Sequence, residues 1–424
     1  MRPAILILLC LVSISSWAAD QRNAGPKKPS RDAELKRALA ASIAPLAQSC
    51  VEKKLFEQAK KFADEALELD PDQVAIKALQ PRLSGTGEPN ENAHKEIENA
   101  RAAAAKTIAR SYVQLAALNT APDLAQNFDK YLKRAFEWEP TEAGSAANIE
   151  WHSAQQKPDL DLAYRYLSFL DRVQPDEART KAMREMEAKV AEKKPILRTC
   201  HSHPMMYYLS LPKGWAPGKK YPILFTNEGA GCNFLANCTA FTNARADLPF
   251  IVVTPFTTVN TMQPVPAKYF YSQETWDRIS KDGRGRFDFE GALAMLEDVK
   301  KEFGGDEKVC LTGFSGGGTL SWQLALACPE KFLGFAPACG NFNGAAQFSN
   351  NAELNEKFPI HAFQGDKDEY LPMLTQQWEN AKANMDRAGF KNYTREMVPN
   401  TGHDVCVKQV LAYFADLLKK AAVK

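Results

Sequence analysis

The spacing of apolar residues changes near residue 195, and this change limits the possible folds more than any other feature. From Arg31 to about Lys194 the chain is rich in Ala, Glu, Lys and Gln, and apolar residues recur every three or four positions, which is typical of amphipathic helices. Beyond Lys194, short apolar runs alternate with helical stretches. That alternation predicts a mostly parallel β-sheet with helices on both faces. We therefore expect an all-α domain over residues 31–194 and an α/β domain over residues 195–424.

The N-terminus has the pattern of a signal peptide. Arg2 supplies a positive charge, Ala4 to Ile14 form an apolar run that is too short to span a bilayer, and Ser16-Trp17-Ala18 offer a small-residue cleavage site. We expect residues 1–19 to be removed and residues 20–30 to be a disordered linker. The mature protein is then exported, to the periplasm or the extracellular space. A signal anchor is the alternative.

Charge and cysteine content exclude some classes of partner and leave others open. The 53 basic and 51 acidic residues give a net charge of only +2, so nothing favours binding to nucleic acid or to an anionic membrane. No other segment approaches a membrane span. The cysteines lack metal-binding spacing, and His201 and His203 form an isolated pair, so we predict no metal and no cofactor. Eight cysteines remain after Cys10 and permit disulfides; Cys232 and Cys238 could close one loop or be free thiols.

The predicted helical domain contains three helices that end in the same way. Each carries small or apolar residues at similar offsets and is followed by a proline, at Pro71, Pro140 and Pro175, which stops the helix. Pairs of helices with this pattern resemble tetratricopeptide repeats, with a period of 34 or 35 residues and one unit hard to recognise. An ordinary helical bundle is the alternative. Residues 84–92, with two Gly and a Pro, are expected to be a loop.

The predicted α/β domain has six strands and four helices. The strands are expected at Met206–Leu211, Tyr221–Thr226, Phe250–Thr254, Lys308–Thr312, Leu333–Pro337 and Pro359–Phe363. The helices are expected at Phe289–Phe303, Gly316–Cys328, Leu374–Ala388 and Asp404–Ala421. Residues 195–204 are interpreted as a linker.

The strongest local motif is Gly313-Phe314-Ser315-Gly316-Gly317, a GxSxG sequence. An apolar run precedes it and a helical stretch follows, as in the strand–turn–helix that exposes a nucleophilic serine. Flanking glycines remove side chains that would clash with the strained turn. The motif predicts that Ser315 is a nucleophile, with the Gly316 amide as one oxyanion donor.

A nucleophilic serine needs a base, and the base needs an orienting carboxylate. Only His361 and His403 lie downstream of Ser315. His361 falls inside a predicted strand and is expected to be a packed residue, whereas His403 lies in a loop before the last helix and is the expected base. The acid is expected in the loop Gly365-Asp366-Lys367-Asp368-Glu369, because the order Ser, Asp, His is typical of this strand–helix pattern.

These motifs, with Cys328-Pro329-Glu330-Lys331-Phe332 and Gly402-His403, resemble the α/β-hydrolase superfamily. The resemblance covers about half the chain and is to carboxylesterases of the polyhydroxybutyrate-depolymerase-like and feruloyl-esterase-like kind. In that family the acid lies in a G-x-x-D-x-x-V-P pattern, which implies Asp368, with Asp366 as the alternative. The second oxyanion donor follows the strand at residues 221–226, which implies Ala230. This chain departs from the family in having Glu228-Gly229 where His-Gly is usual.

Two connecting segments bear on the substrate. Residues 257–285 lack periodicity and carry Tyr269, Phe270, Tyr271 and Trp276; they either wall the substrate pocket or form an aromatic-packed surface loop. Residues 338–358 are too few for the helical lid that α/β-hydrolases acting on long lipids often insert there. We therefore expect a preference for short or compact acyl groups.

The resemblance implies a secreted serine esterase that acts on a small-molecule or polysaccharide-linked ester through an acyl-enzyme. Two alternatives are a serine peptidase of related fold and a helical-repeat binding protein with an inactive hydrolase scaffold. A protein partner for the helical domain is a further possibility.

Overall fold

The computed structural model describes residues 30–119, 125–157, 160–175, 177–344 and 347–422. The predicted signal peptide and most of the predicted linker lie outside these residues. By its internal contacts the chain divides into two compact units. One comprises residues up to Thr120 together with Asn127–Glu150, and the other comprises Ala121–Gln126 and Trp151–Lys424.

The first unit is built from helices, as the sequence predicts. They are α2 (Arg31–Glu52), α3 (Phe56–Leu69), α4 (Val74–Leu79), the 3₁₀ turn η2 (Gln80–Arg82), α5 (Ala93–Ala117), α6 (Ala125–Trp138) and α7 (Pro140–Gln155), whose end belongs to the second unit. The Ser30 hydroxyl caps α2 by accepting the Ala33 amide. The expected loop separates η2 from α5.

Three helices end just before the prolines noted above. α3 stops at Leu69, α6 at Trp138, and α8 (Asp161–Val173) at Val173. The small or apolar residues at the shared offsets are buried in all three. The helix predictions are therefore confirmed, and the regular repeat stays a prediction, since α8 lies in the second unit.

The second unit contains an eight-stranded sheet. Its strands are β1 (Ile196–Thr199), β2 (Met206–Ser210), β3 (Tyr221–Asn227), β4 (Ile251–Pro255), β5 (Gly305–Phe314), β6 (Phe332–Ala338), β7 (Ile360–Gly365) and β8 (Tyr393–Val398). The order in the sheet is β1-β2-β4-β3-β5-β6-β7-β8. β1 and β2 pair antiparallel to their neighbours, and all other pairs are parallel. The predicted mostly parallel sheet is confirmed.

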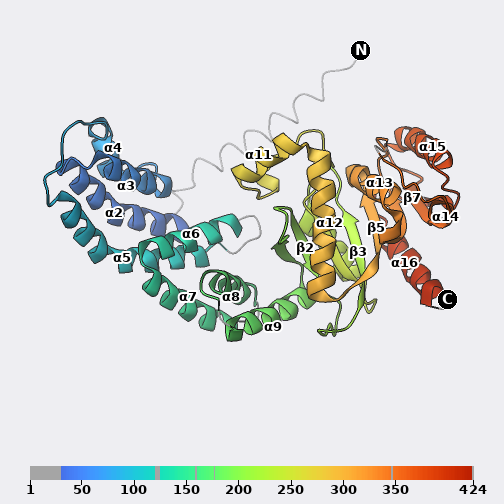
Figure 1. The fold of residues 1–424 in the computed structure, drawn as a ribbon, viewed down its shortest axis with the longest axis horizontal. Helices are drawn as coiled ribbons and strands as arrows, with labels where there is room; N and C mark the ends of the chain where they lie inside the picture. Colours follow the sequence, from blue (N-terminus) through green and yellow to red (C-terminus); the bar gives the residue numbers. More distant parts are fainter. Residues whose placement is uncertain (1–29, 120–124, 158–159, 176, 345–346, 423–424) are drawn as a thin grey trace, which may run out of the picture. The chain divides into compact units, whose positions relative to one another are not determined.

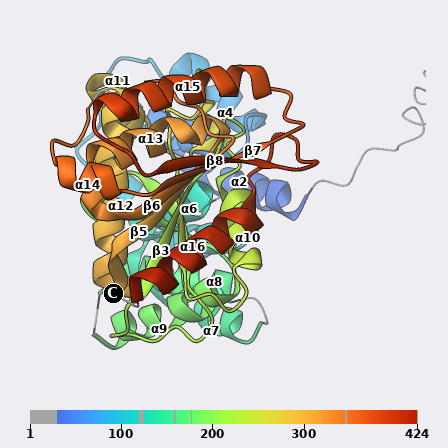
Figure 2. The ribbon, with the colours of Figure 1, turned by 90° about the vertical axis from the view of Figure 1, so that its right-hand side faces the viewer.

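Helices cover both faces of this sheet (Figures 1 and 2). α12 (Arg284–Phe303), α13 (Gly318–Ala327) and α15 (Leu371–Arg387) lie on one face, and α10 (Phe234–Ala244) and α16 (Val407–Ala422) lie on the other. The remaining elements of this unit are α9 (Glu177–Lys193), η4 (Pro266–Lys268), α11 (Gln273–Asp282), η5 (Ser315–Gly317), η6 (Pro329–Lys331) and α14 (Ala352–Lys357). Every residue of β3 and β4 is buried, as expected for strands inside a parallel sheet.

α9 packs directly on the start of the sheet. The Arg198 guanidinium on β1 pairs with Glu187 on α9 and with Glu302 on α12, the latter at 2.7 Å. The amide of Leu211, just after β2, donates to the carbonyl of Ala191 on α9 at 2.9 Å. Although the change from helices to strands comes between Lys193 and Ile196, the contacts therefore group α8 and α9 with the sheet.

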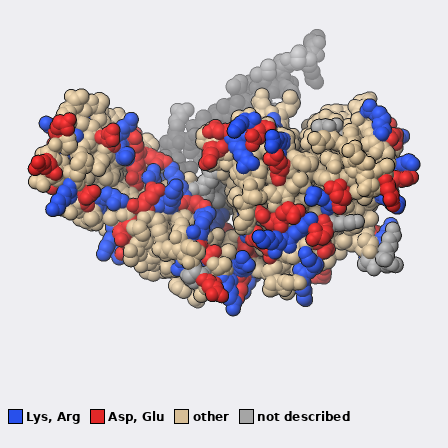
Figure 3. Space-filling model, in the orientation of Figure 1, with Lys and Arg blue, Asp and Glu red and all other residues tan. Residues whose placement is uncertain are grey.

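Acidic and basic side chains are interspersed over the described residues on the face drawn in Figure 3. This face carries no broad patch of one sign. The mixture agrees with the near balance of charge in the sequence.

Candidate active site

The nucleophile turn lies where β5 ends and the chain enters η5 and α13. Ser315 stands at its tip with φ of +47°, a left-handed backbone conformation that is costly for a residue with a side chain. The Asn341 amide donates to the Ser315 carbonyl at 2.8 Å and so supports the turn from the loop after β6. A strained serine between a strand and a helix is the arrangement that presents a nucleophile.

The glycines after Ser315 allow close contact between backbones. A Cβ atom at Gly316 would lie 1.9 Å from the carbonyl oxygen of Asn260, and one at Gly317 would lie 2.5 Å from that of Glu228. Atoms cannot approach so closely, so any side chain here would push neighbouring loops away from the turn. The glycines therefore hold two other loops against the nucleophile.

The structure brings His403 and Asp368 together. Nδ1 of His403 lies 2.8 Å from Oδ2 of Asp368. Asp368 also accepts the Tyr370 amide at 2.7 Å and the Gln364 side-chain amide at 2.8 Å. Burial opposes ionisation of Asp368, but the hydrogen bonds, above all that from His403, outweigh it and hold the pKa of its carboxyl below the usual value. An ionised Asp368 fixes the tautomer of His403.

The two alternative residues lie elsewhere. Asp366 is exposed, and its carboxylate accepts the Thr401 amide at 3.2 Å. His361 lies on β7, where its ring bonds to Thr394 and Glu396 on β8. The expectation that His361 is a packed residue is confirmed.

Two aromatic rings contact the His403 imidazole. The ring of Phe314 lies 4.8 Å from it and that of Tyr370 lies 4.9 Å from it, measured between ring centres. Because Phe314 adjoins Ser315, its contact places His403 beside the nucleophile turn. The Ser315 hydroxyl and His403 are not hydrogen-bonded to each other in the described structure; such bonds commonly tighten only when substrate binds.

The loop after β3 packs against the same turn. A Cβ atom at Gly229 would lie 3.2 Å from Cβ of Ser315, and the Ala230 amide nitrogen lies 3.3 Å from the position of a Cβ at Gly316. The two amides named as oxyanion donors, at Gly316 and Ala230, are thus neighbours beside Ser315.

Glu228, the departure from the family pattern, turns its carboxylate away from this place. Its Oε2 accepts the Asn237 side chain on α10 at 2.9 Å, and the residue is buried. Burial raises the pKa of the Glu228 carboxyl above its usual value, against the hydrogen bonds that favour ionisation. The carboxylate is therefore engaged by α10 and by amides of its own loop.

Residues 257–285 support the oxyanion loop, a role that the sequence did not reveal. The Asn260 side chain donates to the Gly229 carbonyl at 2.9 Å and accepts the Tyr269 hydroxyl at 3.1 Å. Lys268 donates to the Gly231 carbonyl at 2.7 Å. Tyr269 and Tyr271 are buried against other aromatic rings, so the aromatic-packing interpretation of these side chains is confirmed. The segment also contains the helix α11, which the sequence analysis did not predict because it found no periodicity among the proline and aromatic residues in residues 257–285.

Asp288, at the start of α12, anchors the beginning of this segment. Its buried carboxylate accepts the amides of Thr258 and Val259 at 2.6 and 2.7 Å. Burial outweighs these bonds and raises the pKa of Asp288 to about 7. Asp288 therefore supports the site indirectly. It holds Val259, and the next residue, Asn260, bonds the oxyanion loop.

Two clusters among the described residues have side chains that could hold a metal. His201, Asp298 and Glu302 bring ligand atoms within 4.8 Å of one another at the surface, where ion pairs already engage them. His203 is buried apart from them and accepts the Met205 amide. The second cluster adds Cys339 to Asp368 and His403, and these two are already bonded to each other.

The eight cysteines within the described residues are buried and free. Cys232 and Cys238 are therefore not joined. The Cys232 sulfur lies 3.1 Å from the Tyr269 hydroxyl, and Cys238 is buried in α10.

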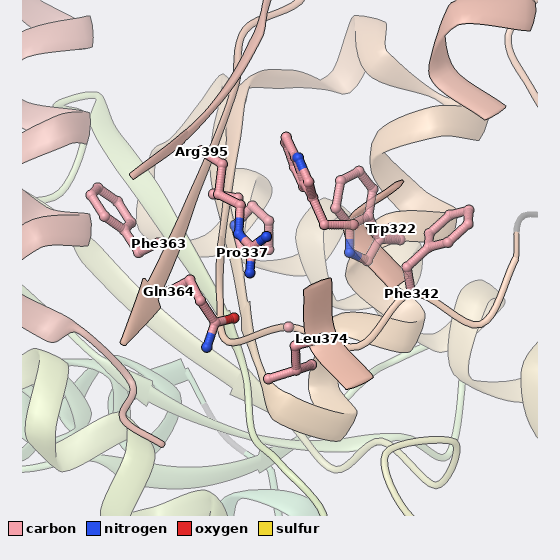
Figure 4. A pocket seen from close by; sticks show the side chains of 10 residues that line it. Trp322, Pro337, Phe342, Phe363, Gln364, Leu374 and Arg395 are labelled. Carbon is pink, nitrogen blue, oxygen red and sulfur yellow. The ribbon is translucent and has the colours of Figure 1, made fainter. Parts of the chain in front are cut away.

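A small pocket lies beneath α15, behind the acid loop (Figure 4). Trp322 from α13, Gln364 from β7 and Arg395 from β8 form part of its wall. The Trp322 indole N–H is buried with no hydrogen-bond partner in the described structure. Gln364, which bonds Asp368, thus separates this pocket from the acid.

Comparison with known families bears on the second unit. Residues 295–420 match the model of a family described as Phospholipase/Carboxylesterase, and this range contains Ser315, Asp368 and His403. This range is similar to that family, and the second unit has the fold of an α/β-hydrolase.

Solved structures similar to this domain include esterases and a depolymerase. LpqC, a poly(3-hydroxybutyrate) depolymerase from Bordetella parapertussis, is 17% identical, with coverage of 52% of this chain and 85% of that chain and a TM-score of 0.38. Est1E from Butyrivibrio proteoclasticus is 14% identical, with coverage of 53% and 99% and a TM-score of 0.35.

A curated relative of the domain is dipeptidyl-peptidase 5 of Porphyromonas gingivalis. It is 26% identical over 207 residues, which is 48% of this chain. The chain spans only 28% of the length of that protein.

Proposed function

We propose that this protein is an exported serine hydrolase that cleaves carboxylic esters through an acyl-enzyme on Ser315. The observation that carries the proposal is the 2.8 Å hydrogen bond between His403 and Asp368, which lies beside a strained serine in a domain matched by a carboxylesterase family. A carboxylate that orients an imidazole beside a serine hydroxyl is the arrangement that serine hydrolases use for acyl transfer.

The proposed reaction has two halves. The Ser315 hydroxyl attacks the ester carbonyl while neutral His403 takes its proton, and the oxyanion is held by the amides of Gly316 and Ala230. Protonated His403 then gives the proton to the leaving alkoxide. Water, activated by the same imidazole, releases the acid and restores Ser315. Asp368 keeps the proton-accepting nitrogen of His403 turned to the serine.

A fluorophosphonate probe and a pair of substrates test this proposal. The probe should label the purified protein at Ser315 and should not label Ser315→Ala. An ester should be hydrolysed faster than the amide with the same acyl group. Labelling without ester hydrolysis would point to another acyl substrate, and no labelling would favour an inactive scaffold.

A serine peptidase is the second candidate. It is favoured by the match to dipeptidyl-peptidase 5, although this chain covers little of that protein. Faster cleavage of a dipeptidyl amide than of the corresponding ester would select it.

Export belongs to the same proposal and rests on the N-terminal pattern of Arg2, an apolar run and Ala18. No helix among the described residues is both long and apolar enough to cross a membrane. N-terminal sequencing of the mature protein should begin near Ala19 or Asp20, and a start at Met1 in a cytoplasmic fraction would refute export.

The substrate is proposed to be an ester of a compact acyl group with a bulky alcohol such as a sugar. The first unit, being helical, is proposed to contact a protein or a polymeric substrate. Such a partner should be captured in a pull-down with the full-length protein and should be absent from a control pull-down with a chain that lacks this unit.

A further inference from the structure

Two cysteines lie beside the proposed catalytic pair. Cys339 directly follows β6, and Cys406 comes three residues after His403, before α16. The Cys339 sulfur lies within 4.8 Å of ligand atoms of both Asp368 and His403. The Cys339 thiol also interacts directly with the Cys406 thiol. The two sulfurs and the imidazole therefore form one cluster.

The backbone at both cysteines is held in a special conformation. Cys339 has φ of +45° and Cys406 has φ of +51°, both in the left-handed region that residues with side chains avoid. The Cys339 amide donates to the Phe363 carbonyl at 2.8 Å, and the Cys406 amide donates to the Asp404 carboxylate at 2.7 Å. Both residues are buried, at 1% and 2% exposure, so this packing fixes the positions of the two thiols relative to each other.

We infer that Cys339 and Cys406 are a redox pair whose oxidation to a disulfide frees His403 to act as a base. This inference rests on the proposed function, because only a catalytic His403 gives the pair an effect on activity. With both thiols reduced, Cys339 gives its proton to the His403 imidazole, which then cannot take the proton of Ser315. In the disulfide, the Cys339 sulfur has neither a proton to give nor a negative charge to stabilise the imidazolium.

The charges around the cluster agree with this reading. The hydrogen bond from Cys406, above all, lowers the pKa of Cys339 to about 6 against the effect of burial, and the same bond raises the pKa of Cys406. Burial lowers the pKa of His403, but the bonds from Cys339 and Asp368 outweigh it and raise the pKa to about 9. Both shifts favour a Cys339 thiolate beside a His403 imidazolium in the reduced protein, and an imidazolium cannot take a proton from serine.

Other groups face this cluster from each neighbouring element. They are Asp368 and Tyr370 from the loop after β7, Asp404 from the His403 loop, and Arg395 from β8, which interacts with Cys339 electrostatically. Asp368 remains next to His403 in both redox states. Loss of the Cys339 thiolate therefore removes one of the two anions that stabilise the imidazolium.

The oxidation is a thiol–disulfide exchange with a low-molecular-mass disulfide such as oxidised glutathione. Because Cys339 is only 1% exposed, the exchange requires local opening of the structure around it. The Cys339 thiolate then attacks one sulfur of that disulfide, whose S–S bond breaks and releases one thiolate. Cys406 then loses its proton and attacks the Cys339 sulfur, which releases the second thiolate. The two released thiolates take up the protons of Cys406 and of His403, so two thiols leave and His403 becomes neutral.

Peptide mapping tests the bond itself, without any reference to activity. The full-length protein is incubated with oxidised glutathione, denatured in N-ethylmaleimide and digested without reductant. A peptide pair joined through Cys339 and Cys406 is the expected result. Quantitative alkylation of both as free thiols would overturn the inference.

Two single variants separate the effect on His403 from mere loss of a crosslink. Both Cys339→Ala and Cys406→Ala abolish the disulfide, yet only Cys406→Ala keeps a thiol beside His403. At pH 7, kcat/KM of wild type reduced with dithiothreitol should be about tenfold or more below that of oxidised wild type, with the acidic limb of its pH profile moved upward. Cys406→Ala, which also lacks the hydrogen bond that most lowers the pKa of Cys339, should respond little to dithiothreitol. Cys339→Ala should show no such shift and no response to dithiothreitol.

Cys328→Ala is the matched control, because Cys328 is another buried cysteine and bonds the carbonyl of Leu324 in its own helix. Dithiothreitol should lower the activity of this variant as it does that of wild type. An equal response of Cys339→Ala to dithiothreitol would refute the role of the pair. If the fluorophosphonate probe labels Ser315 in neither redox state, the proposed function fails, while the mapping still reports the disulfide.

Discussion

At the scale of single residues, the site depends on which of two neighbouring carboxylates reaches the imidazole. Asp366 and Asp368 differ by two positions, and the loop turns one toward Thr401 and the other toward His403. The motif order alone placed the acid in this loop, and the family resemblance selected Asp368. Gln364 and Cys339 went unnoticed, because a glutamine in a strand and a cysteine after one carry no motif.

Replacement of the triad residues should therefore have a graded effect. Ser315→Ala and His403→Ala should lower kcat on a soluble ester by about 10⁴-fold or more while the protein stays folded. Asp368→Asn should be far more damaging than Asp366→Asn, because only Asp368 holds His403. Kinetics and circular dichroism measure both effects. Substantial hydrolysis by Ser315→Ala would refute the mechanism, and the reverse ranking of the two Asp variants would reassign the acid.

Asp288 should make the stability of the protein depend on pH. Its pKa is raised to about 7 in the folded state, above about 3.9 in an unfolded chain. The folded state therefore holds this proton more tightly, and the stabilisation is lost as pH rises from about 4 to about 7. Urea unfolding of wild type should show this decline, and Asp288→Asn should show a flatter one. Parallel curves for the two proteins would contradict the assignment.

At the scale of elements, the connection between β6 and β7 is short, and its described residues include no large helix that could serve as a lid. Between β6 and β7, the described residues form only the six-residue α14. The 339–342 part of this connection instead packs on the nucleophile turn, as the Asn341–Ser315 bond shows. We expect a long acyl chain to stay largely in water here.

Acyl preference should follow from this short connection. Burial of each CH₂ group contributes roughly 0.8 kcal/mol, and a site without a lid forgoes most of that gain for a long chain. We expect kcat/KM to be higher for p-nitrophenyl acetate and butyrate than for the palmitate. A maximum at palmitate would show that residues 257–285, which carry the exposed Met262 and Val265, cover the acyl chain.

At the scale of the whole molecule, the position of α9 changes what a minimal catalytic fragment needs. The domain boundary expected from the sequence, between residues 194 and 195, predicts that a chain starting near Lys194 keeps activity. In the structure, that cut removes Glu187 and leaves Arg198, whose side chain is 11% exposed, with Glu302 as its remaining ion-pair partner. Breaking a buried ion pair from one side costs about 3–5 kcal/mol.

Two fragments test this. A chain beginning near Leu160 keeps α8 and α9 and should hydrolyse a small soluble ester, whereas one beginning near Lys194 should unfold at lower urea concentration or aggregate. Soluble yield, the urea midpoint and ester hydrolysis distinguish them. Equal stability of the two would mean that α9 contributes little to the sheet.

The sequence predicted the centre of the sheet better than its edges, for a physical reason. Six strands were found, because runs such as Ile251–Pro255 are buried on both faces and apolar throughout. β8 was missed because Tyr393–Val398 lies at an edge and only Val398 is buried, so the strand has no continuous apolar run. β1 was mistaken for a linker because it has only four residues. α10 was missed because its sequence lacks charged residues and so any amphipathic pattern.

The crowding at the nucleophile turn affects how related sequences should be read. A Cβ atom added at Gly316, Gly317 or Gly318 would lie 1.9, 2.5 or 2.6 Å, respectively, from a neighbouring backbone atom. Packing alone therefore requires glycine at these three positions. A descendant that had lost its chemistry would still have to retain these three glycines in order to fold, but it would be free to replace the serine. In a set of homologues, an intact glycine run therefore reports shared architecture, and the residue at position 315 reports whether catalysis is still under selection.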